Sequence, residues 1–159
     1  MKKSIILLFL SFVIFGCKSK SVPVTGTKLD MKKEVALKGN WVITSVTYPS
    51  SEYIKVTSFN IEDSQCFVGS EWNFISNNNK GEMKLTKNGC SGYSSPITWY
   101  INKEGKLVMK FLEGAKAKNV NQGYVLTVNN ITETSFELVD YVNVGGNSTK
   151  VVYQFVRNN

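Results

Sequence analysis

The side chains that could do chemistry in this sequence are few, and their spacing follows no catalytic pattern. The chain holds no histidine, which excludes Ser-His-Asp and Cys-His catalysis and removes the commonest zinc ligand. Glu62, Asp63 and Glu71 lie close in sequence, but no nucleophile-and-base pair or metal cluster accompanies them. SGYS at 91–94 lacks the G-x-S-x-G of a nucleophile elbow. We therefore expect a protein that is not an enzyme and that uses no cofactor or metal.

The N-terminal segment MKKSIILLFLSFVIFGC predicts a secretory signal that ends at a cysteine. Its apolar run over 5–16 is shorter than the roughly 20 residues of a membrane-spanning helix and is typical of a signal peptide. Ile14-Phe15-Gly16 before Cys17 resembles the lipobox of bacterial lipoproteins. The resemblance implies that residues 1–16 are a lipoprotein signal peptide and that Cys17 carries acyl chains such as palmitate. The alternative is an ordinary signal peptide followed by an unmodified cysteine.

The lipoprotein resemblance also implies a location. Two or three acyl chains hold a protein durably on a bilayer, so we expect the membrane to be a partner through Cys17. Lys18 stands where aspartate directs inner-membrane retention in some bacteria, and KSKS at 18–21 is basic where some surface-exported lipoproteins are acidic. We therefore expect the cell envelope of a Gram-negative bacterium, with the protein on the periplasmic face of the outer membrane.

The positive charge of the chain is concentrated outside its main domain. The formal net charge is +7, but from residue 35 onward twelve basic residues stand against ten acidic ones. The surplus lies in the signal and in 18–34, where lysines would face lipid headgroups. A nucleic-acid footprint would cluster on the folded domain, so we exclude nucleic acid as a partner.

A lipidated flexible tether over 17–34 is expected to precede a single domain over 35–159. Residues 18–29 combine Ser, Thr, Pro and Gly with lysine, as flexible spacers do. Asp30 can cap a short helix that Gly39 would end. We expect this helix to be a simple lead-in rather than a lid on the domain.

Beyond Gly39, short runs rich in aromatic and β-branched residues alternate with Asn and Gly turns, which predicts an all-β domain. The expected strands lie near 40–48, 70–76, 81–87, 96–103, 106–112, 122–129, 134–142 and 149–157. The segment 49–69 favours a long loop with a helical turn, and 113–121 favours a second loop. About eight short strands with tight turns indicate a sandwich or a small antiparallel up-and-down β-barrel.

The start of this region resembles the lipocalin family. Gly39-Asn40-Trp41 matches the lipocalin G-x-W, and CFVGSEWNF at 66–74 and VVYQFVRN at 151–158 fit the same layout. The region 35–159 is thus similar to the lipocalin-like domains that Gram-negative bacteria attach to a lipobox cysteine. The resemblance implies that Trp41 closes the barrel base, that Arg157 stacks on it, and that the domain binds small hydrophobic molecules.

Cys66 and Cys90 are expected to form a disulfide. A cysteine pair in an oxidising envelope compartment favours a disulfide, whereas a zinc site would need two further ligands. The two positions are symmetric about residue 78, inside the turn NNNKG at 77–81. They would therefore face each other at the open end of a hairpin, as a structural staple without a redox role.

Alternation along the strands places one set of side chains inside the barrel. The residues expected to line the interior and contact a ligand are Trp41, Trp72, Phe74, Trp99, Met109, Phe111, Tyr124, Phe136, Tyr153 and Phe155. Tyr124, Tyr153 and Ser45 would supply polar anchors. An eight-stranded barrel is either filled by its own side chains or holds one small ligand, and the sequence leaves both open.

Two functions follow from these two states of the interior. The first is a lipid-anchored lipocalin-like protein that binds or carries a small hydrophobic molecule in the bacterial envelope. The second is a non-enzymatic interaction protein, for example an inhibitor of a cell-wall enzyme. In that case a filled barrel would present 49–69 and CSGYSSP at 90–96 to a protein partner. The presence or absence of a cavity separates the two.

Overall fold

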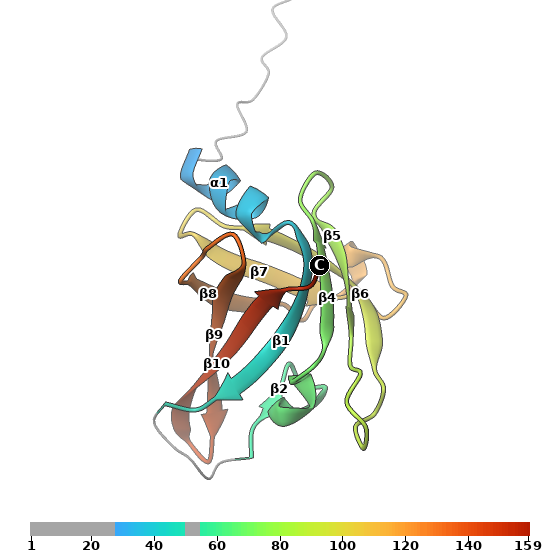
Figure 1. The fold of residues 1–159 in the computed structure, drawn as a ribbon. Coiled ribbons are helices and arrows are strands. Elements are labelled where there is room, and N and C mark those ends of the chain that lie inside the picture. Colours follow the sequence, from blue (N-terminus) through green and yellow to red (C-terminus); the bar gives the residue numbers. More distant parts are fainter. Residues whose placement is uncertain (1–27, 50–54) are drawn as a thin grey trace, which may run out of the picture.

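Eight antiparallel strands form a closed barrel in the computed structural model, which describes residues 28–49 and 55–159 (Figure 1). The barrel strands are β1 (Gly39–Thr47), β4 (Glu71–Ile75), β5 (Lys80–Lys84), β6 (Ser94–Ile101), β7 (Lys106–Phe111), β8 (Tyr124–Asn129), β9 (Ser135–Val144) and β10 (Asn147–Arg157). Their order around the barrel is β1-β10-β9-β8-β7-β6-β5-β4, and pairing of β4 with β1 closes it. The predicted all-β up-and-down barrel is confirmed. The signal segment and Cys17 lie outside the described residues.

Helix α1 (Lys28–Leu37) lies across one end of the barrel, which we call the base (Figure 1). It begins before the expected cap at Asp30 and so takes in the end of the expected spacer. The Glu34 carboxylate accepts a hydrogen bond from the backbone N–H of Ile101 at 3.0 Å, and Leu37 is fully buried. Within 28–49 and 55–159, no helix is long and apolar enough to cross a membrane. The helix covers the base and is therefore more than the simple lead-in that the sequence suggests.

An irregularity in β1 alters the alternation that the sequence predicts. The pairing of β1 with β10 shifts between Ile43 and Ser45. A bulge of this kind re-aims the side chains that follow it, and accordingly Val46 is buried while Ser45 is exposed. The prediction that Ser45 anchors a ligand inside the barrel is therefore wrong.

The segment after β1 is mostly loop, as predicted, but it carries two short strands that sequence reasoning missed. β2 (Thr57–Ser58) and β3 (Glu62–Asp63) form a separate two-stranded sheet, and the 3-10 helix η1 (Ser64–Phe67) follows. This segment lies at the end of the barrel opposite α1, which we call the mouth (Figure 1). A second 3-10 helix, η2 (Ala117–Asn119), lies in the loop predicted over 113–121.

The predicted disulfide joins Cys66 in η1 to Cys90 in the loop between β5 and β6, with Cα atoms 5.8 Å apart. The hairpin of β4 and β5 pairs Trp72 with Met83. Both cysteines lie beyond the open end of this hairpin, as their symmetry about the turn predicts. The bridge fastens η1 to the barrel wall near the mouth.

Candidate functional site

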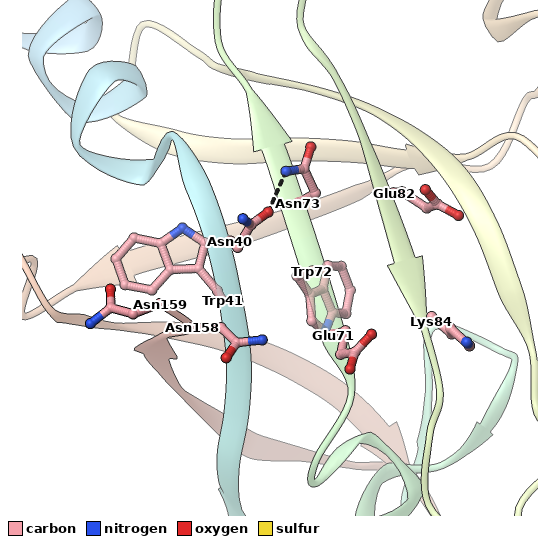
Figure 2. A pocket seen from close by; sticks show the side chains of 9 residues that line it. All are labelled: Asn40, Trp41, Glu71, Trp72, Asn73, Glu82, Lys84, Asn158 and Asn159. Carbon is pink, nitrogen blue, oxygen red and sulfur yellow. Dashed lines mark hydrogen bonds between the residues drawn. The ribbon is translucent and has the colours of Figure 1, made fainter.

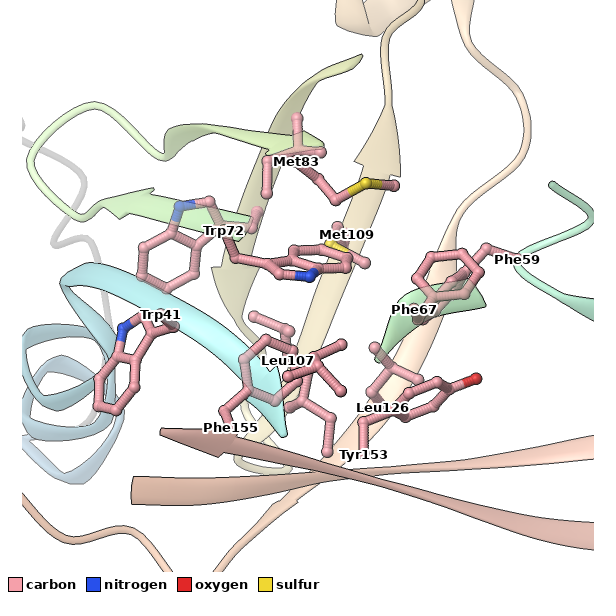
Figure 3. Close-up of a cluster of buried hydrophobic side chains, with 14 of the residues drawn as sticks. Trp41, Phe59, Phe67, Trp72, Met83, Leu107, Met109, Leu126, Tyr153 and Phe155 are labelled. Carbon is pink, nitrogen blue, oxygen red and sulfur yellow. The ribbon is translucent and has the colours of Figure 1, made fainter. Parts of the chain in front are cut away.

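The barrel interior is an aromatic cluster that runs from the base to the mouth (Figure 3). Nine of the ten residues predicted to line it are buried, namely Trp41, Trp72, Phe74, Trp99, Met109, Phe111, Phe136, Tyr153 and Phe155. Tyr124 is half-buried at the mouth. Ring centroids are 4.5 Å apart for Phe136 and Phe155 and 5.2 Å apart for Phe74 and Trp99, the spacing of directly packed rings. These rings fill the half of the barrel nearest the base.

The base is closed by the pair that the lipocalin resemblance predicts. The guanidinium carbon of Arg157 lies 4.1 Å from the centre of the Trp41 ring, within the range of a cation–π interaction. The indole N–H of Trp41 donates to the Leu37 carbonyl at 2.8 Å, and Arg157 Nη1 donates to the Lys38 carbonyl at 3.1 Å. Gly39 has φ +122°, and a Cβ there would lie 2.5 Å from Arg157 Nη1. The G-x-W glycine therefore makes room for the arginine.

A phenylalanine from outside the barrel strands fills the mouth. Phe59 lies in the turn between β2 and β3 and is only 4% exposed. Its ring centroid lies 5.2 Å from those of Phe67 and Tyr124 and 5.4 Å from those of Phe111 and Tyr153. Phe59 and Phe67 lie together at one end of the aromatic cluster (Figure 3). We call Phe59 the plug, because it inserts among rings from four other elements.

Two hydroxyl groups hold the plug, and its backbone is strained. The Tyr124 hydroxyl donates to the Phe59 carbonyl, and the hydroxyl oxygens of Ser58 and Tyr153 are 2.5 Å apart. Phe59 and Asn60 have φ values of +54° and +53°. This left-handed conformation is uncommon for a bulky residue such as Phe59 and costs it about 1–3 kcal/mol, whereas asparagine adopts it more readily. The strain at Phe59 would be relieved if this residue left the mouth.

Tyr124 and Tyr153, both predicted as polar anchors, meet at the mouth around the plug. Burial raises the pKa of the Tyr153 hydroxyl, and burial likewise raises the pKa of Tyr124. Both hydroxyl groups therefore stay protonated near neutral pH and can donate to a ligand. A nearby negative charge, that of Asp140, also raises the pKa of each tyrosine.

Asp140 is a half-buried charged residue near the mouth. It lies on β9 between Leu138 and Val142, which both pack on the core, and it pairs with the fully buried Val151 of β10. Alternation therefore directs its carboxylate into the barrel. Burial raises the pKa of Asp140, and the N–H of Tyr141, which donates to Oδ1 at 2.8 Å, only partly opposes this. The mouth thus combines aromatic rings with a half-buried carboxylate.

A hollow of about 140 Å³ opens beside the plug. Its lining residues are Phe59, Asn60, Ile61, Phe111, Glu113, Val120, Gln122 and Tyr124. Pockets for small molecules start at roughly 300 Å³, so this hollow alone is too small for most ligands. Access to the aromatic interior requires that Phe59 move.

Two larger hollows lie on the outside of the barrel. One of about 340 Å³ lies against β1, β4 and β5, where Glu71, Glu82 and Lys84 contribute charged side chains (Figure 2). There Asn73 Nδ2 donates to the side-chain oxygen Oδ1 of Asn40 at 2.5 Å. The other, about 700 Å³, is an open groove between α1 and the loop that follows β8. The charged and amide groups of the first hollow suit it poorly to a hydrophobic ligand.

The carboxylates that the sequence singles out take part in local contacts of their own elements. Asp63 caps η1, since its Oδ1 accepts from the N–H of Gln65 at 2.8 Å, and Glu71 pairs with Lys84 in the hairpin of β4 and β5. Over 28–49 and 55–159, no group of three or more His, Cys, Asp or Glu side chains is placed to hold a metal ion. The candidate site is therefore the mouth.

Sequence reasoning names Tyr124 and Tyr153 as polar anchors in the barrel interior but misses Phe59, Phe67 and Asp140. Asp140 could have been found, because alternation from Phe136 and Leu138 points it inward. Phe67 adjoins a cysteine of the disulfide, which brings it to the barrel wall. No feature of the sequence places Phe59 inside the barrel, because it lies in a turn, where strand alternation does not apply.

Closed barrels of eight strands either fill the interior with their own side chains or hold one small ligand, and here aromatic side chains occupy the interior up to the mouth. The lipocalin-like domain family matches residues 37–158, and the chain belongs to this family. The lipocalin fold suggests binding of small hydrophobic molecules.

Among solved structures, the chain is similar to bovine odorant binding protein in complex with a selenium-containing odorant. The identity is 12% and the TM-score 0.45, over 84% of this chain and 74% of that chain. The same bovine protein complexed with its natural ligand gives 13% identity and a TM-score of 0.43, over 78% and 72% of the two chains. A search of curated proteins finds no match.

Proposed function

We propose that this protein is a non-enzymatic lipocalin-like protein that binds a small hydrophobic molecule at the barrel mouth, in the space that Phe59 fills. The supporting observation is the plug itself. A strained loop residue places an apolar ring among Phe67, Phe111, Tyr124 and Tyr153. That ring stands where the ring of a ligand would stand.

Release of the plug would convert the small hollow into a ligand-sized site. The space of the Phe59 ring would join the hollow of about 140 Å³ beside it. The wall would then be aromatic, with the hydroxyl groups of Tyr124, Tyr153 and Ser58 freed from their present bonds. An apolar wall with a few polar groups that orient the ligand is typical of small-molecule sites.

The most direct experiment uses native mass spectrometry on residues 18–159, which include every described element, secreted to the periplasm without Cys17. We expect a discrete small-molecule adduct that disappears after delipidation and returns on adding lipid extract. A mass that no extract shifts would contradict the proposal. The Phe59→Ala variant serves as a second sample. If Phe59 leaves the mouth too slowly for a ligand to enter the native protein, the ligand should still bind to this variant.

The place of action is proposed to be the outer membrane of a Gram-negative bacterium, on its periplasmic face, with anchoring through Cys17. Support comes from the lipobox resemblance of residues 14–17. Because the tether would join the base at α1, the mouth would point away from the membrane. Metabolic labelling with palmitate tests this: label and membrane association should be lost in Cys17→Ser. Unchanged fractionation of that variant would contradict it.

A second candidate is an interaction protein, and the filled base half of the barrel favours it. In this alternative the loops at the mouth contact a protein partner of the envelope. The disulfide between Cys66 and Cys90 would hold the segment 90–96 and η1 as a stable surface. Two results together would favour this candidate. Neither sample would carry a small-molecule adduct, and crosslinking at Tyr93 would capture a stable protein partner.

A further inference from the structure

The carboxylate of Asp140 gives the mouth a chemical preference among hydrophobic molecules. We propose that the site takes a small aromatic amine, whose ring replaces the plug and whose protonated nitrogen pairs with Asp140. This inference rests on the proposed function, since it names the ligand class of the same site.

No cationic side chain of the described residues forms an ion pair with Asp140. Among the residues that the structure describes, the ion pair present is Lys106 with Glu104, on the outside of the barrel. Asp140 accepts its hydrogen bond from the N–H of the next residue, Tyr141. A carboxylate held in an apolar wall without a positive partner is unfavourable. A cationic ligand would supply the missing charge.

Aromatic rings surround the carboxylate of Asp140. Asp140 pairs with Val151 and Leu138 pairs with Tyr153, so Asp140 and Tyr153 are diagonal neighbours on the inner face of β9 and β10. The charge of Asp140 also raises the pKa of both Tyr153 and Tyr124. The plug contacts both rings, with centroids 5.2 Å and 5.4 Å away. Ammonium groups are attracted to the faces of such rings. A ligand ring in the place of Phe59 would therefore carry its amine to Asp140 across an aromatic surface.

A second carboxylate, that of Glu113, lies at the rim of the same hollow. Its side chain is exposed, and the Tyr93 hydroxyl donates to it at 2.7 Å. Exposed charges are screened by water and salt, whereas buried ones are screened much less. Asp140 is therefore the stronger partner for an ammonium group, and Glu113 is the alternative that the test must separate.

The test measures by calorimetry the binding of three matched probes to residues 18–159. The probes are 2-phenylethylamine, its neutral analogue 2-phenylethanol, and the anion 3-phenylpropionate. We expect the amine to bind about tenfold more tightly than the alcohol, as a hydrogen bond to a charged group allows, and the anion to bind most weakly. In Asp140→Asn, the tenfold preference for the amine over the alcohol should be lost.

Two further variants make the result decisive. Glu137→Gln removes a carboxylate from the outer face of the same strand β9 and should keep the preference for the amine. Loss of the preference in Glu113→Gln but not in Asp140→Asn would overturn the inference. Equal binding of amine and alcohol to the native sequence would overturn it while leaving the proposed function standing. Failure of all three probes to bind, even to Phe59→Ala, would overturn both.

Discussion

The ring of Phe59 stacks on that of Tyr153, with centroids 5.4 Å apart and planes 25° from parallel. Tyr153 belongs to the last barrel strand, whereas Phe59 belongs to a turn of the separate β2–β3 sheet. The plug can therefore leave the mouth without breaking any pairing of the barrel itself. In the proposed function, this separation would let the mouth open to a ligand while the barrel stays closed.

Replacing the plug should cost stability and gain binding. Phe59→Ala is expected to lower the free energy of unfolding by about 3 kcal/mol, since it removes a buried ring and leaves a cavity. The cavity adjoins the hollow at the mouth, so 2-phenylethanol should bind more tightly than to the native sequence. Urea unfolding followed by tryptophan fluorescence, together with calorimetry, measures the two effects.

Phe136→Ala is the matched control for the plug. Phe136 is fully buried and packs edge-on against Trp41 at 4.7 Å, near the base. Its loss should cost a similar free energy of unfolding, of about 3 kcal/mol, without improving the binding of 2-phenylethanol. Equal gains in binding for both variants would mean that any cavity suffices and that the mouth has no special role.

At the base, Gly39→Ala should destabilise the protein more than Gly146→Ala. Both glycines have positive φ, +122° and +89°, and such strain costs about 1–3 kcal/mol for other residues. Only at Gly39 would the new Cβ also meet Arg157, whereas the space around Gly146 is open. Thermal unfolding in an Arg157→Ala background checks the cause, because there the two substitutions should cost nearly the same.

Removal of the disulfide should weaken the fold and loosen the mouth. The bridge spans a sequence separation of 24, for which loop entropy gives roughly 3–4 kcal/mol. The double variant Cys66→Ser/Cys90→Ser should lose about this free energy of unfolding. Reductant should lower the stability of the native sequence by the same amount and leave the variant unaffected. A reductant effect on the variant would show that the loss has another cause.

Asp140→Asn should stabilise the unliganded protein near neutral pH and lose that advantage in acid. Burial raises the pKa of the folded-state carboxyl above its ordinary value of 3.8, so the folded protein binds this proton more tightly than the unfolded chain. Native stability therefore falls as the pH rises through the interval between the two pKa values. Asparagine does not ionise and avoids this loss.

Urea midpoints of the native sequence and Asp140→Asn, compared from acid to neutral pH, measure this effect. Tyr124 and Tyr153, which face Asp140 from the neighbouring strands, stay protonated throughout, because burial raises the pKa of both. Glu113 is present in both proteins and therefore does not contribute to the difference between them. A difference in stability that does not change with pH would contradict a buried, ionising Asp140.

Much of the fold follows from local patterns in the sequence. Strand alternation is a direct consequence of backbone geometry, and it correctly places Trp72, Trp99 and Phe155 inside the barrel. The Gly39-Asn40-Trp41 motif locates the base, where Arg157 stacks as the resemblance implies. Alternation fails at Ser45, because a bulge shifts the pairing of β1 with β10 there. No local pattern in the sequence predicts this shift.

The candidate site was less predictable than the fold. Phe59 enters the interior because its turn is folded over the mouth by tertiary contacts with Tyr124 and Tyr153. A sequence pattern records which face of a strand is apolar, but not which loop residue reaches into a barrel. For Asp140, strand alternation does predict the inward position. Its lack of an ion-pair partner among the described residues is visible only in the structure.

The measurement that tests the central claim most directly is a titration of residues 18–159 with 2-phenylethanol, followed by aromatic NMR of phenylalanine- and tyrosine-labelled protein. We predict that the resonances of Phe59, Tyr124 and Tyr153 shift together, while those of Phe136 and Phe155 near the base do not. Shifts confined to residues outside the mouth, or no shift at a saturating concentration of the probe, would contradict a ligand site behind the plug.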